Sequence, residues 1–380
     1  MPKLIFILSA FELCRMALGF YLPLYFKNFL HFSGAQIGLI FGLGSLTSLL
    51  TILPIGAGND RITPKRMAIA GILLTLVCYV AVGFVGAAFA GVLALFLLRD
   101  IGQNLFSQSG NALMYKLMGQ KKTGKFFGWV QLFLALGDGT GMIAGGLFLM
   151  AYGFDQLFIA LSVMLVFLIL IAWDLPQVKT APVTLLHYRK EVFRPRVALF
   201  ILIFFLFAFH FGAEATSYGL FLSENLHLSQ ARMGYYMAVE LIFLGAAAFY
   251  LGRRYDRRQS SLKNIIFIGL LASGIGHMGM IVPNVWISVA FRALHGWGDG
   301  AIILAMRLGI NRFFKIESVG STSGLVNFIM IIGNFTSALL FGPLGERWGY
   351  EWPLLISGIT TVFICFLVQF YRHLLEEKVV

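Results

Sequence analysis

Gly56-Ala-Gly-Asn-Asp60-Arg61 and Gly252-Arg-Arg-Tyr-Asp256-Arg257 share the pattern G-x-x-x-D-R and begin 196 residues apart. Each copy directly follows an apolar run that is long enough to cross a membrane. A second landmark repeats at the same offset, because Tyr152-Gly153-Phe154-Asp155 corresponds to Trp348-Gly349-Tyr350-Glu351. The repeat predicts that the chain contains two parallel copies of one membrane unit.

The composition indicates that most of the chain lies in lipid. Apolar residues make up 59% of the 380 residues and charged residues only 12%, whereas soluble domains carry about 25% charged residues. The apolar runs are continuous and do not alternate with period two, which favours helices over barrel strands. We therefore expect an all-α membrane protein with twelve spans, near 4–26, 35–55, 67–88, 90–115, 126–150, 156–174, 198–222, 230–251, 264–282, 285–311, 320–343 and 352–371.

The positive charge of the chain is distributed very unevenly. The net charge is +12, yet 22 of the 29 Lys and Arg residues fall on the side of the two termini. The opposite side holds only Lys27, Arg232 and Arg347, and the other four lie within predicted spans. This asymmetry is the positive-inside pattern. It predicts a multi-pass protein of the cell's inner (cytoplasmic) membrane with both termini cytoplasmic, and it argues against binding of nucleic acid.

The spans divide into two groups of six around one longer, basic connection. We expect an N-terminal bundle at 1–174, a cytoplasmic linker at 175–197 that contains Pro176, Pro182 and Pro195, and a C-terminal bundle at 198–380. The three cysteines all fall within spans. They show neither the spacing of a metal site nor that of a disulfide framework.

Three motifs resemble those of the major facilitator superfamily, and the resemblance covers the whole chain. The first is the stretch from Gly56 to Arg66, with a looser second copy from Gly252, and the second is Arg99 in the fourth span, which Arg292 mirrors in the tenth. The third is a glycine series in the fifth span, in which Met142 stands where the antiporter signature of this family has proline. The series consists of Gly128, Gly137, Gly141, Gly145 and Gly146. The resemblance implies the twelve-helix fold, with two six-helix bundles related by a pseudo-two-fold axis along the membrane normal.

The repeated loop motif also resembles a conformational latch. In that reading Asp60 faces the start of the eleventh helix, where Ser321, Thr322 and Ser323 lie. Asp256 faces the start of the fifth helix near Thr123. An aspartate in such a position can stabilise the positive end of a helix. The latch residues would be Gly56, Asp60, Arg61, Arg66, Gly252, Asp256 and Arg257. The glycines of the fifth helix can also be explained by close helix packing alone.

Ionisable residues within the predicted spans are candidates for function, because charge is costly in a membrane. They gather on the first, fourth, seventh and tenth spans, which the resemblance assigns to the walls of a central cavity. Glu12 and Arg15 are three residues apart and can neutralise each other. His210 and Glu214, like His295 and Asp299, are four residues apart, and a histidine–carboxylate pair can exchange a proton near neutral pH. We expect proton coupling among Glu12, Glu214, Asp299, His210 and His295.

The arginines and aromatic residues of these spans are candidates for contact with a solute. Asp100 neighbours Arg99 in sequence and would point elsewhere on the helix, so we expect the arginines to find partners among Glu12, Glu214 and Asp299. Aromatic rings can stack on an organic solute, although they serve more often in packing. The predicted cavity set is Arg15, Arg99, Arg292, Trp297, Tyr21 and Tyr218. Asp138 and Glu240 are the next candidates for coupling.

The sequence favours a proton-coupled secondary transporter of a small organic solute that works by alternating access. The helix-five glycines favour export by proton antiport, and the alternative is a proton symporter that imports a sugar, nucleoside or organic anion. No G-x-x-x-x-G-K-S/T loop for nucleotide occurs, and no nucleophile–base pair indicates an enzyme. We expect the proton gradient to supply the energy, and we expect no cofactor and no metal. The expected partners are the solute, protons and lipid, and the expected working unit is a monomer.

The charge asymmetry yields a test of topology. A Ser229→Cys variant should react with a membrane-impermeant thiol reagent added outside, and a Ser260→Cys variant only from the cytoplasmic side. Labelling of both cysteines from one side would contradict the predicted topology.

Overall fold

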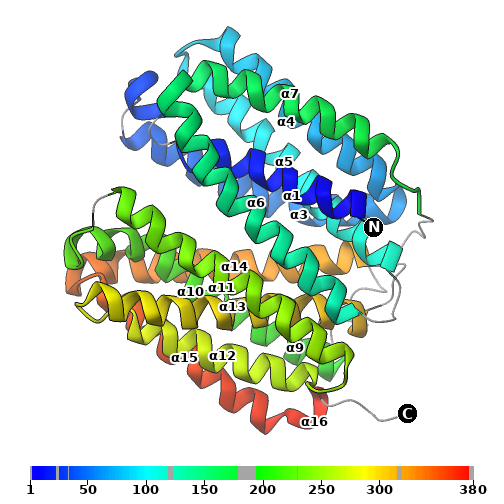
Figure 1. Cartoon of the computed structure of the whole chain (residues 1–380), viewed down its shortest axis with the longest axis vertical. Helices are drawn as coiled ribbons and strands as arrows, with labels where there is room; N and C mark the ends of the chain where they lie inside the picture. Colours follow the sequence, from blue (N-terminus) through cyan, green and yellow to red (C-terminus); the bar gives the residue numbers. More distant parts are fainter. Residues whose placement is uncertain are drawn as a thin grey trace. The chain divides into compact units, whose positions relative to one another are not determined.

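The structure is a computed structural model that describes residues 2–375 except 23–24, 33, 119–122, 179–193, 229 and 315–318. The described residues form helices and contain no strand (Figure 1). The helices are α1 (Pro2–Gly19), η1 (Tyr25–Phe29), α3 (Gly34–Arg61), α4 (Pro64–Val85), α5 (Phe89–Met118), α6 (Thr123–Tyr152), α7 (Phe154–Trp173), α9 (Pro195–Phe207), α10 (Phe209–Ala213), η2 (Glu214–Tyr218), η3 (Phe221–Asn225), α11 (Gln230–Asp256), α12 (Leu262–Gly279), α13 (Val285–Phe313), α14 (Val319–Trp348), α15 (Glu351–Phe370) and α16 (Arg372–Leu375).

Ten helices of the described chain are long and apolar enough to cross a membrane. One of them is the continuous stretch Pro195–Tyr218, which includes α9, α10 and η2. The helices α1 and α13 are not among the ten, and these two carry Glu12, Arg15, Arg292 and Asp299. The all-helical membrane fold is therefore confirmed, while the predicted count of twelve spans depends on these two charged helices and stays a prediction.

The 196-residue repeat of the sequence is also present in the positions at which corresponding helices begin. The helices α3 and α11, α5 and α13, and α6 and α14 each begin 196 residues apart. In this register Arg99 corresponds to His295, and Phe96 corresponds to Arg292. The interpretation that Arg292 mirrors Arg99 was therefore off by three residues, nearly one helical turn. The two copies share their helices but not the positions of their buried charges.

Hydroxyl side chains begin the helix that follows each G-x-x-x-D-R copy. Thr63 caps α4, where its Oγ1 accepts a hydrogen bond of 3.4 Å from the amide of Arg66, and Pro64 occupies the first turn. Ser261 caps α12 in the same way, through a hydrogen bond of 3.3 Å from the amide of Asn264. Both caps satisfy amides that a helix start leaves unpaired, which explains why the chain turns there.

The chain divides into two compact units, and the helices α6 and α14 each contribute residues to both units. One unit comprises Met1–Gly119, Leu136–Thr184 and Lys315–Leu325, and the other comprises Gln120–Ala135, Leu185–Phe314 and Val326–Val380. The predicted boundaries at 174 and 197 stay a prediction, because most of the linker between them lies outside the described residues.

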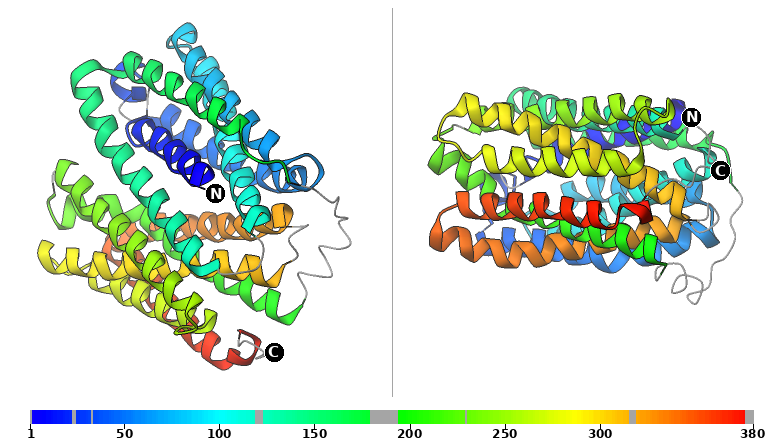
Figure 2. Two further views of the ribbon diagram at one scale, coloured as in Figure 1. Left: turned by 45° about the vertical axis from the view of Figure 1, so that its right-hand side comes forward. Right: turned by 90° about the horizontal axis from the view of Figure 1, so that it is seen from below.

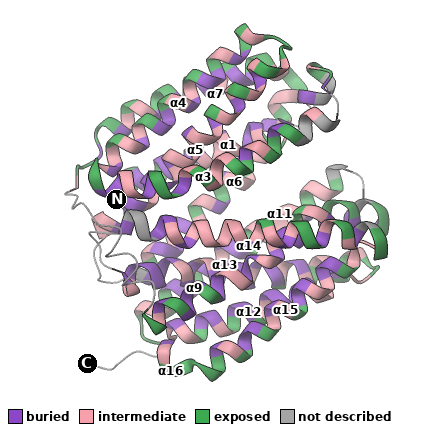
Figure 3. Cartoon of the chain, turned by 180° about the vertical axis from the view of Figure 1, so that it is seen from behind, coloured by how far each residue is buried: buried purple, intermediate pink, exposed green. Residues whose placement is uncertain are grey.

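Within each unit the helices pack side by side. In the first unit α4 packs against α5 and α7, and α3 packs against α5. In the second unit α13 contacts both α11 and α12, and α12 also contacts α15 (Figure 2). Exposed positions run along α4 and α15 (Figure 3) and include the large apolar side chains of Phe84 and Phe363. Such faces suit contact with lipid.

Glycines allow α6 to approach α1 more closely than any other residue would. Gly137, Gly141 and Gly145 are four residues apart and meet Ser9, Leu13 and Ala17, which are also four apart. A Cβ atom on Gly141 would lie 2.5 Å from the carbonyl oxygen of Leu13. The series therefore serves close packing between backbones, as small residues do in membrane helices. This close packing does not depend on the proline that the antiporter signature has at the position of Met142.

A methyl group added at Gly141 should lower the stability of the protein, whereas a methyl group added at Gly139 should not. We expect Gly141→Ala to destabilise the protein by about 1–3 kcal/mol, because it pushes two backbones apart. Gly139→Ala is the matched control, since a Cβ there meets nothing within 4 Å. Thermal unfolding in detergent measures both variants. Equal melting temperatures would contradict the packing role.

Candidate functional site

A cluster of charged residues, in which the cation is buried and the two carboxylates are partly buried, lies in the second unit on η2, α11 and α13. Arg292 of α13 is fully buried. One of its terminal nitrogens pairs with Glu214, at the start of η2, and the other pairs with Glu240 of α11. The ring of Tyr218 lies against the guanidinium, 4.4 Å from its central carbon to the ring centre. Two carboxylates and an aromatic face thus replace the water that Arg292 gives up.

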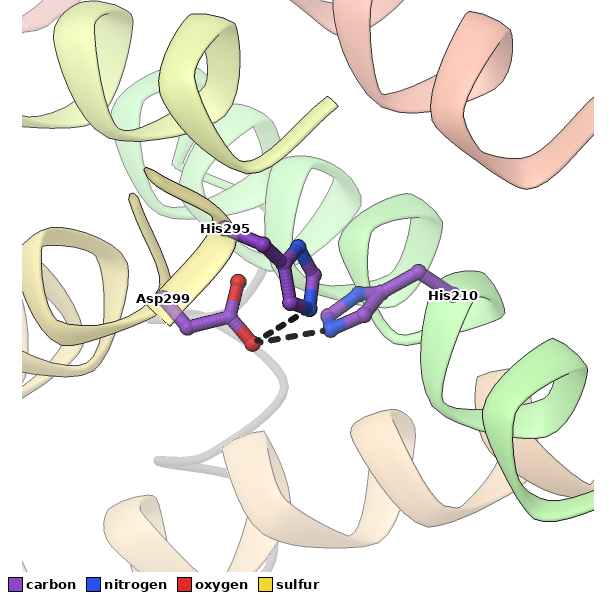
Figure 4. A group of neighbouring side chains, drawn as sticks. All are labelled: His210, His295 and Asp299. Atoms are coloured by element: carbon purple, nitrogen blue, oxygen red, sulfur yellow. Dashed lines mark hydrogen bonds and ion pairs between the residues drawn. The ribbon is translucent and has the colours of Figure 1, made fainter. Parts of the chain in front are cut away.

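Two histidines and an aspartate continue this cluster. Figure 4 shows His210 from α10 and His295 and Asp299 from α13 with their polar ends converging. Nε2 of His210 lies 3.1 Å from Oδ2 of Asp299. Nε2 of His295 lies 3.5 Å from the same oxygen and 3.3 Å from Oε1 of Glu214. The two pairs that the sequence predicted are therefore parts of one network, and His210 pairs with Asp299.

The other ring nitrogens are held by groups that fix the histidine tautomers. Nδ1 of His210 lies 2.5 Å from the carbonyl oxygen of Phe207, and Nδ1 of His295 lies 3.0 Å from that of Ser273. A carbonyl oxygen only accepts hydrogen bonds, so both Nδ1 atoms carry the proton. The Ser273 hydroxyl donates to Oδ1 of Asp299 at 2.6 Å. Both Nε2 atoms are thus directed toward the carboxylate.

Close backbone packing brings these short side chains together. A Cβ on Gly296 would lie 2.5 Å from the carbonyl oxygen of Glu240, and a Cβ on Gly276 would lie 2.6 Å from Cα of His295. The glycines let α11 and α12 approach α13 closely. The segment that holds Glu214 is a π-helical turn, a feature that is frequent at functional sites.

The sequence interpretation missed one residue of this group, His277. It is fully buried on α12, and its ring centre is 4.8 Å from that of His295. Its Nδ1 contacts the Ser357 hydroxyl at 3.2 Å. His277 lies on α12, which is not one of the helices that the resemblance assigns to a cavity. A histidine within an apolar span was the available signal.

The charged residues within the predicted spans of the first unit form two smaller groups. Arg15 pairs with Glu12 and, at 3.2 Å, with Asp138 of α6. The pair of Glu12 with Arg15 that the spacing allows is present, and Asp138 adds a second carboxylate to the same arginine. Arg99 pairs with Asp100 at 2.5 Å. The expectation that Asp100 points elsewhere was wrong, because a long arginine side chain can fold back onto its neighbour.

The three aromatic candidates have different surroundings. Tyr218 belongs to the cluster through Arg292. The hydroxyl of Tyr21 donates to the carbonyl oxygen of Met142 at 2.8 Å, so this side chain ties the turn after α1 to α6. Trp297 packs beside Tyr250 of α11, with ring centres 5.8 Å apart. Although Trp297 stands between His295 and Asp299 in sequence, the helix turns its side chain to another face.

The second copy of the loop motif makes the contact that the sequence predicts. The carboxylate of Asp256, the last residue of α11, accepts hydrogen bonds from the amides of Gly124 at 2.9 Å and Lys125 at 2.7 Å. These amides belong to the first turn of α6. Gly252 lies directly against the Gly124 carbonyl, and Arg257 is exposed. The role of this contact as a latch remains a prediction.

The first copy of the motif makes a contact within its own unit. Asp60 is buried, and its carboxylate pairs with Lys116 of α5 at 2.9 Å. The start of α14 does lie beside the motif, since a Cβ on Gly324 would be 3.5 Å from Cα of Gly56. The side chains of Ser321 and Thr322, proposed as capping groups, lie outside the described residues. Arg61 and Arg66 are exposed.

Comparisons with known proteins point to one family. The family model of the Major Facilitator Superfamily matches residues 4–260 and 215–379. The MFS-type transporter SLC18B1 of Rattus norvegicus is 24% identical over 356 residues, which cover 87% of this chain and 77% of that protein. The multidrug resistance protein MdtG of Escherichia fergusonii is 26% identical over 137 residues, 36% of this chain and 33% of that protein. The crystal structure of the human organic anion transporter MFSD10 (TETRAN) matches with a TM-score of 0.77 at 14% identity, and the match covers 97% of each chain.

The Asp256 contact can be tested without knowledge of a ligand. A carboxylate at a helix start stabilises it by about 0.3–1 kcal/mol, so Asp256→Asn should speed hydrogen exchange of the Gly124 and Lys125 amides roughly two- to fivefold. The control is Asp174→Asn, which removes an exposed carboxylate that pairs with Lys3. Exchange measured by mass spectrometry should change only in the Asp256 variant. Unchanged exchange would contradict a stabilising role.

Proposed function

The chain belongs to the Major Facilitator Superfamily of membrane transporters, and from this premise we propose that it is a proton-coupled secondary transporter that exports a small organic solute by antiport. Membership makes the chain a transporter and not an enzyme. Coupling to protons, the direction of transport and the solute are the proposed parts. The cluster around Arg292 is the observation that supports coupling to protons.

The cluster supports coupling through its charge. Glu214, Glu240 and Asp299 are carboxylates, Arg292 is the one guanidinium, and His210, His277 and His295 complete the group. With neutral histidines the group carries a charge of −2, which is unfavourable away from water. Protons on two of its members would neutralise it. A site of this kind takes up and releases protons as its exposure changes.

Glu214 is the proposed coupling residue because it joins the two parts of the cluster. Its carboxylate contacts both Arg292 and His295. Protonation of Glu214 would leave Arg292 with Glu240 alone and would weaken the tie between η2 and α13. A proton can therefore favour one conformation over another by differential interaction, which is what coupling requires. Glu12 and Asp138, with Arg15, are the corresponding candidates in the first unit.

Export is favoured over import by two observations. The glycine series of α6 resembles the antiporter signature, and the relative MdtG is a multidrug resistance protein. An organic solute would meet Tyr218 and the carboxylates of the cluster, which suit an aromatic or cationic compound. Export would use the proton gradient of the inner membrane as its energy source and would need no cofactor for energy. We propose a monomer as the working unit.

Glu214→Gln tests the coupling. The variant should abolish solute accumulation driven by an imposed pH gradient in proteoliposomes, because the amide cannot release a proton, yet retain downhill exchange. The matched control is Glu224→Gln, which changes an exposed carboxylate on η3. Labelled solutes from a panel of organic cations, anions and sugars report transport. Full gradient-driven accumulation by Glu214→Gln would place coupling elsewhere, with Asp138 and Glu240 next.

The direction of transport has its own measurement. Inside-out vesicles with an acidic lumen should accumulate the solute if the protein is an antiporter. Under the same gradient a symporter would drive the solute out of the lumen. Depletion would therefore overturn export in favour of proton symport.

A further inference from the structure

The lone pairs of two buried histidines are directed at one carboxylate. Both Nδ1 atoms donate to carbonyl oxygens, so in neutral His210 and His295 each Nε2 presents a lone pair toward Oδ2 of Asp299. Nε2 of His295 makes no hydrogen bond within the described residues. Three electron-rich atoms that face one another without water require a positive charge among them. This is the arrangement that Figure 4 displays.

We propose that His210, His295 and Asp299 form a binding site for a divalent transition-metal ion of the zinc class. Ligand atoms on tetrahedral zinc are about 3.3 Å apart, because Zn–N and Zn–O bonds measure about 2.0–2.1 Å. The separations of 3.1 Å and 3.5 Å between the two Nε2 atoms and Oδ2 fit that spacing. All three ligand atoms lie within 4.8 Å of one another, and all three residues are buried.

Glu214 lies beside the three ligands, where it pairs with Arg292. Its Oε1 lies 3.3 Å from Nε2 of His295, the same spacing again. Two imidazoles and carboxylate oxygens are a ligand set that suits zinc, manganese or cobalt. A magnesium or calcium site would instead be built from oxygens alone.

The surroundings orient the ligands as the outer shell of a metal site does. Metal-bound histidines commonly donate their second ring N–H to a backbone carbonyl, and ligating carboxylates are themselves hydrogen-bonded. The carbonyls of Phe207 and Ser273 and the hydroxyl of Ser273 make these contacts. His277 packs on His295 without belonging to the ligand set. The rings are thus fixed before an ion arrives.

The charge of the cluster matches one divalent ion. Its carboxylates exceed its guanidinium by two negative charges when the histidines are neutral, and a single M²⁺ balances them. Two protons balance them equally, so metal and protons compete for the same nitrogens, and metal affinity falls as pH falls. The metal site rests on this geometry alone, and it stands whether or not the chain exports its solute with protons.

Metal titration of the purified full-length chain tests the proposal. After removal of the affinity tag and treatment with a chelator, Zn²⁺ followed by calorimetry should bind at one ion per chain. Co²⁺ should give the visible absorption of a tetrahedral site. Loss of any one ligand should abolish the Co²⁺ band, as tested by His210→Gln, His295→Gln and Asp299→Asn. Ser273→Ala, which removes a hydrogen bond to a ligand, should lower the affinity for Zn²⁺ roughly 10–100-fold, and each ligand variant should lower it further.

Controls separate this site from incidental binding and from a failure to fold. His31→Gln and His373→Gln change exposed histidines and should bind Zn²⁺ as the unaltered chain does. Gel filtration and thermal melting report the fold of every variant. Loss of binding in the exposed-histidine variants, or equal binding in all variants, would overturn the site. Absence of Zn²⁺ binding by a folded chain that still couples to protons would show that the cluster binds protons only, and would leave the proposed function standing.

Discussion

The burial of Arg292 is the constraint on which the second unit depends. A fully buried guanidinium loses its water, and its interactions must come from the protein. Glu214 and Glu240 supply the charge, and the face of Tyr218 covers the plane of the group. Because these partners come from η2 and α11, the guanidinium of Arg292 holds both elements to α13.

Glycines make that arrangement possible. The approach of Gly296 to α11 and of Gly276 to α13 brings the backbones so close that short side chains such as Ser273 reach across. The same device in α6 joins it to α1 in the first unit and to α11 in the second, where Gly128 meets the Ala248 carbonyl at a Cβ distance of 2.5 Å. Close packing and polar contact thus act together, as they do generally between helices in lipid.

The two halves of the repeat use similar helices for different chemistry. In the first unit Arg99 folds onto Asp100, and Arg15 pairs with the two carboxylates of Glu12 and Asp138. In the second unit the cluster around Arg292 has three carboxylates and three histidines. The histidines are therefore what distinguishes the charged cluster of the second unit.

The sequence alone determined the class of the fold and the residues worth attention. Hydropathy fixed the helices because lipid leaves the backbone no other means to satisfy its hydrogen bonds, and the 196-residue repeat indicated two copies. The resemblance of the loop motif to that of a known family also led correctly to the contact between Asp256 and the start of α6. Only the tertiary structure decided the pairing of the buried charges. The partnership of His210 with Asp299 and the packing of His277 on His295 depend on how the helices are rotated and spaced, which sequence spacing within one helix does not specify. The pair of Arg99 with Asp100 depends on the conformation of a long side chain, which the sequence does not specify either.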